Sequence, residues 1–412
     1  MPTLLITHIR QLLQVRESPR LLRGKEMADL PVLKNAYVLV EDGIIAGYGP
    51  MSDWNSKPLP KQQLDASGKM VLPCWCDSHT HLVFAGSREQ EFEMKIRGAS
   101  YDEIARAGGG ILNSARLLQQ TSEDELFRQA WDRLQEIQQF GTGAVEIKSG
   151  YGLTLESELK MLRVIRRLKQ QSRMAIKATF LGAHAFPPEY RDNQEGYIRL
   201  IIDDMLPAVA HEGLADYIDA FCEEGFFSPE QTGRILAAGK RYGLKAKLHA
   251  NQLHRSGGVQ TGVAHGALSV DHLECMGEEE IHCLQGSDTI ATMLPSAAFF
   301  LRLPYPPARR MLDAGLPLAI ATDYNPGSSP SGNMPLLIAL SGIQMRMTPA
   351  EAINAATLNG AYAMEVADQL GSITLGKRAH LIITQAMPSL AYWPYRFGNN
   401  LIDRVLLDGE ES

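Results

Sequence analysis

Short apolar runs alternate with longer amphipathic segments through the middle of the chain. Eight of these runs predict strands, approximately at residues 70–77, 143–148, 174–181, 216–221, 244–249, 267–270, 289–293 and 317–321. Apolar runs of this length, bounded by turn residues, are typical of strands that are buried on both faces. Strands of this kind that alternate with helices predict a parallel sheet.

Helix signals separate most of these runs. Ser122 with Glu125 reads as a capping box, and apolar residues then recur on one helical face, as at Leu126 and Ala130. Similar starts follow Ser228 and Thr348, each with a proline at the first helical position. Both chain ends differ: residues 36–40 and 44–48 flank a hairpin signal at Asp42-Gly43, and residues 371–384 again read as short strands.

Eight strands that are mostly followed by helices predict a (β/α)8 barrel, because a barrel closes a parallel sheet without leaving edges. A doubly wound open sheet is the rival, but no glycine-rich phosphate turn follows any early strand. The barrel makes a further prediction. Its functional side chains should lie at the carboxyl ends of the strands.

Composition excludes several classes of function. The 412 residues carry 40 Lys and Arg against 47 Asp and Glu, a formal charge of −7, without a polybasic run that would bind nucleic acid. Uncharged stretches such as 289–301 are too short or too interrupted to span a membrane. Five scattered cysteines form no disulfide framework, and the first twenty residues lack a signal-peptide pattern. A cytoplasmic protein is therefore expected.

Polar residues close several of the predicted strands. His79 and His81 follow the first run as His-Thr-His, and residues i and i+2 of an extended segment point the same way. His249, His272 and Asp323 close three later runs. Because strand ends converge at one mouth of a barrel, His79, His81, His249 and Asp323 are predicted to bind Zn²⁺ or Fe²⁺. His272 is predicted to lie nearby as a proton carrier or as a partner of a ligand.

These positions resemble the amidohydrolase superfamily. The resemblance rests on Asp77-Ser-His-Thr-His81, a lone histidine on the fifth run, a histidine on the sixth and an aspartate on the eighth. Narrower motifs, which together span nearly the whole chain, resemble the imidazolonepropionase family: residues 79–86, 91–93, 107–111, 146–152, 180–184 and 323–329. The resemblance implies a distorted (β/α)8 barrel over residues 69–366, with a small β-sandwich from residues 1–68 and 367–412. A homodimer is also implied.

The resemblance further implies a reaction: hydrolysis of 4-imidazolone-5-propanoate to N-formimidoyl-L-glutamate in histidine degradation, by attack of a metal-bound hydroxide on the ring carbonyl. Asp323 and His272 would carry the water's proton to the departing ring nitrogen, and Gln252 would contact the substrate ring. Where many relatives would have an acidic residue, this chain has Asn251, whose role stays open.

Substrate contacts are implied in the same way. Arg88 would bind the propionate, although its charged stretch is equally typical of a surface arginine. Tyr151 and His184 would face the mouth, although a ring packed under a loop and a core histidine bonded to backbone are the ordinary alternatives. The remaining expected contacts, to the glutamate portion of the product, are Asn325, Gly327 and Ser328.

One absence bears on the number of metal ions. Binuclear members of the superfamily use a lysine on the fourth strand as a bridge, but the fourth run, residues 216–224, has no lysine. Lys148 and Lys177 lie on other runs, so one metal ion per chain, Zn or Fe, is expected. Two alternatives stay open: a mononuclear deaminase that acts on nucleobase rings, and a non-catalytic relative. The deaminase would not need Arg88 to bind a carboxylate, and the non-catalytic relative should lack at least one metal ligand.

Overall fold

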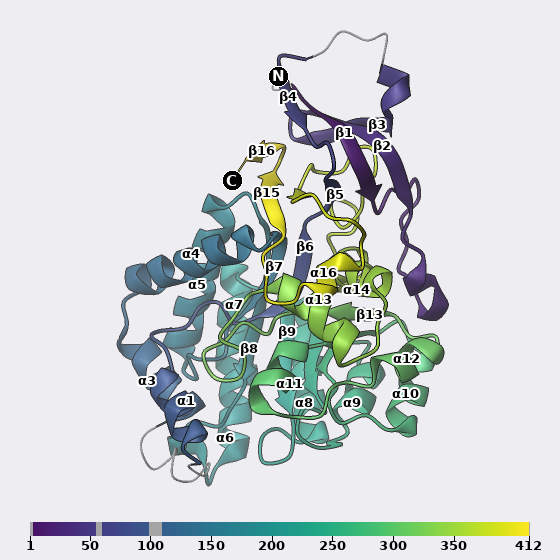
Figure 1. Cartoon of the computed structure of the whole chain (residues 1–412). Helices are drawn as coiled ribbons and strands as arrows, with labels where there is room; N and C mark the ends of the chain where they lie inside the picture. Colours follow the sequence, from purple (N-terminus) through teal and green to yellow (C-terminus); the bar gives the residue numbers. More distant parts are fainter. Residues whose placement is uncertain (1–2, 55–59, 99–108, 412) are drawn as a thin grey trace.

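The computed structural model describes residues 3–54, 60–98 and 109–411, and it contains two eight-stranded sheets. One is a parallel barrel surrounded by helices, and the other is built from both chain ends, near which both termini lie (Figure 1). The barrel strands are β6 (Trp75–Thr80), β7 (Thr142–Lys148), β8 (Ala175–Ala183), β9 (Tyr217–Cys222), β10 (Lys245–Ala250), β11 (Ser269–His272), β12 (Ile290–Met293) and β13 (Leu318–Ile320).

The barrel strands pair in sequence order, from β6 to β13. The circle closes just past β13, where the amide of Asp323 donates to the carbonyl of His79 and the amide of His81 donates to the carbonyl of Tyr324. The first and last strands are thus joined through the residues that the sequence singled out. The predicted distorted (β/α)8 barrel is confirmed.

Helices cover the outside of the barrel. They are α1 (Glu89–Ile96), α3 (Ile111–Gln120), α4 (Glu123–Gln139), α5 (Leu155–Gln171), α6 (Gln194–Arg199), α7 (Leu206–Glu212), α8 (Pro229–Arg241), α9 (Gly258–Ala264), α10 (Glu278–Gln285), α11 (Pro295–Leu301), α12 (Ala308–Asp313), α13 (Met334–Ile343), α14 (Pro349–Ala356) and α15 (Leu358–Ala363). A further short helix, α16 (Tyr392–Tyr395), packs against α13. In the described part of the chain, no helix is both long and apolar enough to cross a membrane.

Two of the three predicted capping boxes are complete. Ser228 and Thr348 each accept a hydrogen bond from the backbone three residues on, and the residue there bonds back. The box at Ser122 is only half formed: its hydroxyl accepts from the amide of Glu125, but the Glu125 carboxylate binds Arg128 and Gln129 instead. Arg128, one turn away, offers the carboxylate two N–H donors, whereas the cap amide offers one.

The second sheet has strands β1 (Thr3–Leu13), β2 (Val32–Glu41), β3 (Ile44–Pro50), β4 (Gln62–Asp65), β5 (Met70–Pro73), β14 (Leu381–Thr384), β15 (Ile402–Leu407) and β16 (Glu410–Glu411). The predicted hairpin is present, with Asp42 and Gly43 at φ 52° and 79°. The first predicted strand, 70–77, is wrong as one element, because it divides into β5 of this sheet and β6 of the barrel. The domain limits at residues 68 and 366 stay a prediction.

Alternation along the barrel strands decides which side chains face the interior. Asp77 and His79 share a face of β6, Glu146 and Lys148 share a face of β7, and these four side chains are buried. Because a barrel interior excludes water, such charges require partners there. The interior beneath the mouth is therefore polar and ion-paired, and it supports the site described next.

Candidate active site at the barrel mouth

A cavity of about 400 Å³ opens at the carboxyl ends of the barrel strands. Eleven of the twelve residues that the sequence singled out as ligands, catalytic groups or substrate contacts line it: His81, Arg88, Tyr151, His184, His249, Gln252, His272, Asp323, Asn325, Gly327 and Ser328. The twelfth, His79, is completely buried against His81, His249 and His272. The structure thus brings the whole predicted set into one place.

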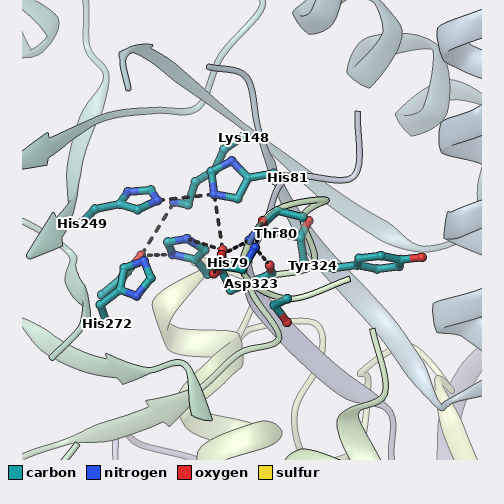
Figure 2. Close-up of polar contacts among 12 residues, drawn as sticks. His79, Thr80, His81, Lys148, His249, His272, Asp323 and Tyr324 are labelled. Carbon is teal, nitrogen blue, oxygen red and sulfur yellow. Dashed lines mark hydrogen bonds and ion pairs between the residues drawn. The ribbon is translucent and has the colours of Figure 1, made fainter. Parts of the chain in front are cut away.

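Three histidine nitrogens and one carboxylate oxygen converge beneath this cavity (Figure 2). Nε2 of His79 lies 3.6 Å from Oδ1 of Asp323, and Nε2 of His81 lies 3.5 Å from the same oxygen. Nε2 of His249 lies 3.4 Å from Nε2 of His81. These side chains come from β6, from the start of the loop that follows it, from β10 and from the segment after β13.

Two aspartates orient two of these rings. Nδ1 of His79 donates to Oδ2 of Asp271 at 2.7 Å, and Nδ1 of His249 donates to Oδ2 of Asp219 at 3.0 Å. A histidine whose Nδ1 carries the donated proton presents a free lone pair on Nε2. Neither aspartate was predicted to be part of the site; Asp219 shares the inward face of β9 with Tyr217 and Phe221.

This donor set fits a metal ion. Ligand atoms about 2.0–2.1 Å from a tetrahedral zinc ion lie roughly 3.3–3.5 Å apart, close to the separations found here. In the part of the chain that the structure describes, Nε2 of His79 is buried without a hydrogen-bond partner although it points at the shared centre. A buried nitrogen left without a partner is costly, and a bound cation removes that cost. His79, His81, His249 and Asp323 can therefore hold the ion.

His272 occupies the same centre from the side. Its backbone lies in the left-handed region, φ 86°, which turns it toward the mouth although it follows the inward-facing Asp271. Burial alone would lower the pKa of His272, but Glu274, whose Oε1 lies 3.4 Å from Nδ1, together with Asp323 and Asp271 raises it. Glu274 is buried and was missed by the sequence argument.

Asp323 also has positive φ, 52°, and is held by neighbours in its own turn. Ser328 Oγ donates to Oδ2 of Asp323 at 3.0 Å, which leaves Oδ1 of Asp323 free to bind a metal ion. Burial raises the pKa of Asp323, against the lowering influence of His272 and His249. Strained backbone at the ends of two strands, at His272 and Asp323, is typical of functional sites.

Arg88 lines the cavity, and one nitrogen of its guanidinium is ion-paired. Its Nη2 lies 2.5 Å from Glu91, and the second oxygen of Glu91 accepts from the amide of Gly110. Its Nε is buried without a partner among the described residues, so the guanidinium keeps donors for an anionic ligand. Gly327 packs against this guanidinium so closely that a side chain there would collide with it. Residues 107–108 of the motif at 107–111 lie outside the described residues.

Tyr151 and His184 face each other across the cavity wall. Their rings are 5.4 Å apart, and His184 stacks on His81 at 5.2 Å. Nδ1 of His184 donates to the carbonyl of Gly150 at 2.9 Å, so the backbone-bonded alternative is correct for that nitrogen. Burial and the nearby His249 lower the pKa of His184 to about 3. The ring is therefore neutral, and in this tautomer its unprotonated Nε2 can only accept a hydrogen bond.

The Asn325 turn differs from expectation in one respect. Its residues were expected to contact the glutamate portion of the product, but the backbone amides of Gly327 and Ser328 both donate to Oδ1 of Asn325 at 2.8 Å. The side-chain amide of Asn325 donates in turn to the carbonyl of Asp323 and to Ser328 Oγ. Asn325 therefore organises the turn that carries Asp323, because its short amide side chain can reach the following backbone donors.

Gln252 follows a tight turn at the end of β10. Asn251 lies at φ 55°, a conformation that asparagine tolerates, and its Nδ2 donates to the carbonyl of Cys275. Glu223 accepts from the amides of Leu253 and His254, which fixes the segment that follows. The left-handed backbone conformation at this turn therefore accounts for an asparagine at position 251.

A buried layer of charged side chains lies beneath the four proposed metal ligands. It consists of Glu146, Lys148, Asp219, Lys247 and Asp271, whose side chains are all 0% exposed. In the sequence, Lys148 bears only on the number of metal ions, since it lies on a run other than the fourth. The missed signal was a charged residue two positions before another polar residue within an apolar run, as in Glu146-Ile-Lys148 and Lys247-Leu-His249.

A metal-binding cluster at the mouth of a (β/α)8 barrel defines a class of metal-dependent hydrolase, and the family comparison agrees. The model of the amidohydrolase family matches residues 70–411, and the chain belongs to this family. It is 56% identical over 413 residues to an imidazolonepropionase of Christiangramia forsetii, covering 99% of each chain, and 56% identical over 411 residues to one of Flavobacterium johnsoniae, covering 98% and 99%.

Solved structures share the fold at much lower identity. Guanine deaminase from C. acetobutylicum aligns with a TM-score of 0.71 at 15% identity over all of both chains. A zinc-containing adenosine deaminase from Xanthomonas campestris aligns with a TM-score of 0.71 at 17% identity, covering 99% of this chain and 92% of the other. These similarities concern the barrel and its accompanying sheet.

Proposed function

We propose that this protein hydrolyses the cyclic amide of 4-imidazolone-5-propanoate to N-formimidoyl-L-glutamate in histidine degradation. The observation that carries the proposal is one cavity with a metal-binding cluster and an arginine with spare donors. A small ring with a carboxylate tail needs both groups: a Lewis acid at the ring carbonyl and a guanidinium at the tail. The relatives at 56% identity support the same assignment.

We propose one metal ion per chain, Zn or Fe, held by His79, His81, His249 and Asp323. When bound, the ion polarises the ring carbonyl and makes water a competent nucleophile near neutral pH. Among the described residues, barrel strand four (β9) carries no lysine to bridge a second ion. Metal analysis should therefore give one equivalent per chain, and two equivalents would contradict this stoichiometry.

The protein's own groups handle the proton. Asp323, His272 and His79 each offer one ligand atom, and these atoms lie within 4.8 Å of one another, so Asp323 and His272 reach the same reacting centre. Asp323 would accept the proton from the attacking water, and His272, whose pKa Glu274 helps to raise, would deliver a proton to the departing ring nitrogen.

The remaining cavity residues would orient the substrate. Arg88 would bind the propionate through donors that Glu91 leaves free. Tyr151 would donate through its hydroxyl, and neutral His184 would accept or stack through its free edge. Gln252 would contact the ring with its amide, and the turn of Asn325 and Ser328 would keep Asp323 in position.

A direct assay tests the proposal. Metal-loaded protein should remove the ultraviolet absorbance of imidazolonepropionate and should release no ammonia from guanine, adenosine or cytosine. Release of ammonia without loss of imidazolonepropionate would support the deaminase alternative. The similarity in fold to deaminases at low identity does not by itself favour that alternative. Metal-free protein that retains its cellular role would support the non-catalytic alternative.

We further propose a cytoplasmic homodimer. All five cysteines are free in the structure, as a reducing compartment requires. Ile343, Tyr395 and Phe397 are 57%, 75% and 65% exposed on and beside α13 and α16, and a dimer interface there would cover them. Light scattering of the native chain and of Tyr395→Glu tests this: the native chain should be a dimer and the variant a monomer.

A further inference from the structure

The two histidine ligands that aspartates orient are linked through a single lysine. Nζ of Lys148 lies 2.9 Å from Oδ2 of Asp219 and 3.7 Å from Oδ2 of Asp271. These are the same oxygens that accept from Nδ1 of His249 and of His79. One ammonium group therefore contacts both carboxylates at the atoms that set the direction of the metal ligands.

The lysine reaches this position because of the barrel's geometry. Lys148 ends β7, while Asp219 and Asp271 lie on β9 and β11, the two neighbours of the strand that carries His249. The two aspartates would repel each other in a water-free interior. The third carboxylate near Lys148, Glu146, is also bound by Lys247, so Lys148 is the cation shared by the two orienting aspartates.

We propose that Lys148 is a positioning residue of the metal centre: its ammonium bridges Asp219 and Asp271 and thereby holds His249 and His79 in one fixed relative arrangement. Among the described residues, no hydrogen bond or ion pair joins Lys148 to the four ligands, although its charge acts through space on His79 and His81. Its positioning effect passes through two hydrogen bonds, each of which fixes the proton on Nδ1 and leaves Nε2 free for the cation.

The charge on Lys148 is consistent with this role. Burial opposes it, but Asp219, Glu146 and Asp271 raise the pKa of the amine above its ordinary value. Two lysines and three carboxylates leave the buried layer with one excess negative charge, which favours a cation directly above it. The inference depends on the proposed metal site but not on the identity of the substrate.

Metal affinity tests the proposal in the full-length protein. Lys148→Met should weaken Zn²⁺ binding, measured by competition with a chelator, by roughly 10- to 100-fold, the range typical of lost outer partners. Lys377→Met is the matched control, because Lys377 is also a buried lysine but bonds Leu370 and Ser372 away from the site. The control should keep the native affinity even if its melting temperature falls.

A second measurement begins with the wild-type protein. In metal-free wild-type protein, ¹⁵N–¹H spectra of the imidazoles should show His79 and His249 as Nδ1–H tautomers, and Lys148→Met should lose this uniform state. Folded Lys148→Met with native zinc affinity, or wild-type protein with mixed tautomers, would overturn the inference. Wild-type protein that takes up no metal would overturn the proposed function together with it.

Discussion

Buried histidines occur at both ends of the barrel, but they differ in the hydrogen bonding of their ring nitrogens. At the mouth, His79 has one nitrogen bonded to Asp271, while the other is buried, unbonded and directed at a shared centre. At the base, His380 lies between the barrel and the second sheet, with Nδ1 near the carbonyl of Gly143 and Nε2 near Asp408. Both rings are nearly inaccessible, so burial alone does not distinguish them.

The difference lies in the second nitrogen. A histidine with both nitrogens satisfied contributes packing and hydrogen bonds, and it needs nothing further. A histidine with one buried, unbonded nitrogen that lies close to other ligand atoms is suited to bind a cation. The same residue type is thus structural at one end and functional at the other, and the following predictions test that contrast.

Loss of a ligand should have the largest effect. His249→Ala removes one of the four donors and leaves Asp219 without its imidazole partner. Metal content should fall from one equivalent to near zero, and turnover should fall to background. Elemental analysis and the ultraviolet assay on the same sample measure both. Full metal content in this variant would show that other atoms hold the ion.

Removal of the proton carrier should separate chemistry from metal binding. His272→Asn should lower kcat by roughly 10²- to 10⁴-fold, the usual contribution of a positioned acid or base. Metal content should stay at one equivalent, because the four ligands remain. A wild-type rate would exclude His272 from the mechanism.

Loss of the guanidinium should act on substrate binding. Arg88→Met should reduce kcat/KM by about 10- to 100-fold, mainly through KM, because a charge-assisted hydrogen bond contributes ~1.5–3 kcal/mol. Arg116→Met provides the control, because Arg116 is exposed and bonds Asn113. Equal effects of the two substitutions would argue against carboxylate binding by Arg88.

The base histidine should affect stability alone. His380→Phe leaves the carbonyl of Gly143 without its partner and should cost about 1–3 kcal/mol of unfolding free energy. Activity per folded molecule should be unchanged. Thermal denaturation combined with the assay measures the two effects, and a loss of turnover in the folded variant would connect this end of the barrel to catalysis.

The same site predicts a small dependence on pH. Burial lowers the pKa of His380 below its ordinary value of 6.5, so below that pH the unfolded chain binds a proton that the folded chain does not. Stability should therefore decrease as the pH falls from about 6.5, and His380→Phe should reduce this slope. Asp408 has a lowered pKa, so its contribution is full above 3.8 and is lost only in stronger acid.

Sequence patterns predicted much of this molecule. Apolar runs located the barrel strands, because a strand buried on both faces must be apolar over most of its length. Polar residues at the ends of those runs located His79, His249 and Asp323, since such residues have no packing role there. Division of the run at 70–77 between two sheets was not predictable, because both sheets require the same apolar residues.

The sequence by itself predicted the barrel, the family and the four proposed ligands, because these depend on residue type and on strand order. Tertiary structure alone decided which carboxylate orients which ring, as Asp271 does for His79 across 192 positions. It also decided that His184 gives its donor to Gly150 and that Lys148 connects two aspartates. Such pairings depend on distances of a few ångströms between strands, and those distances exist only once the barrel has closed.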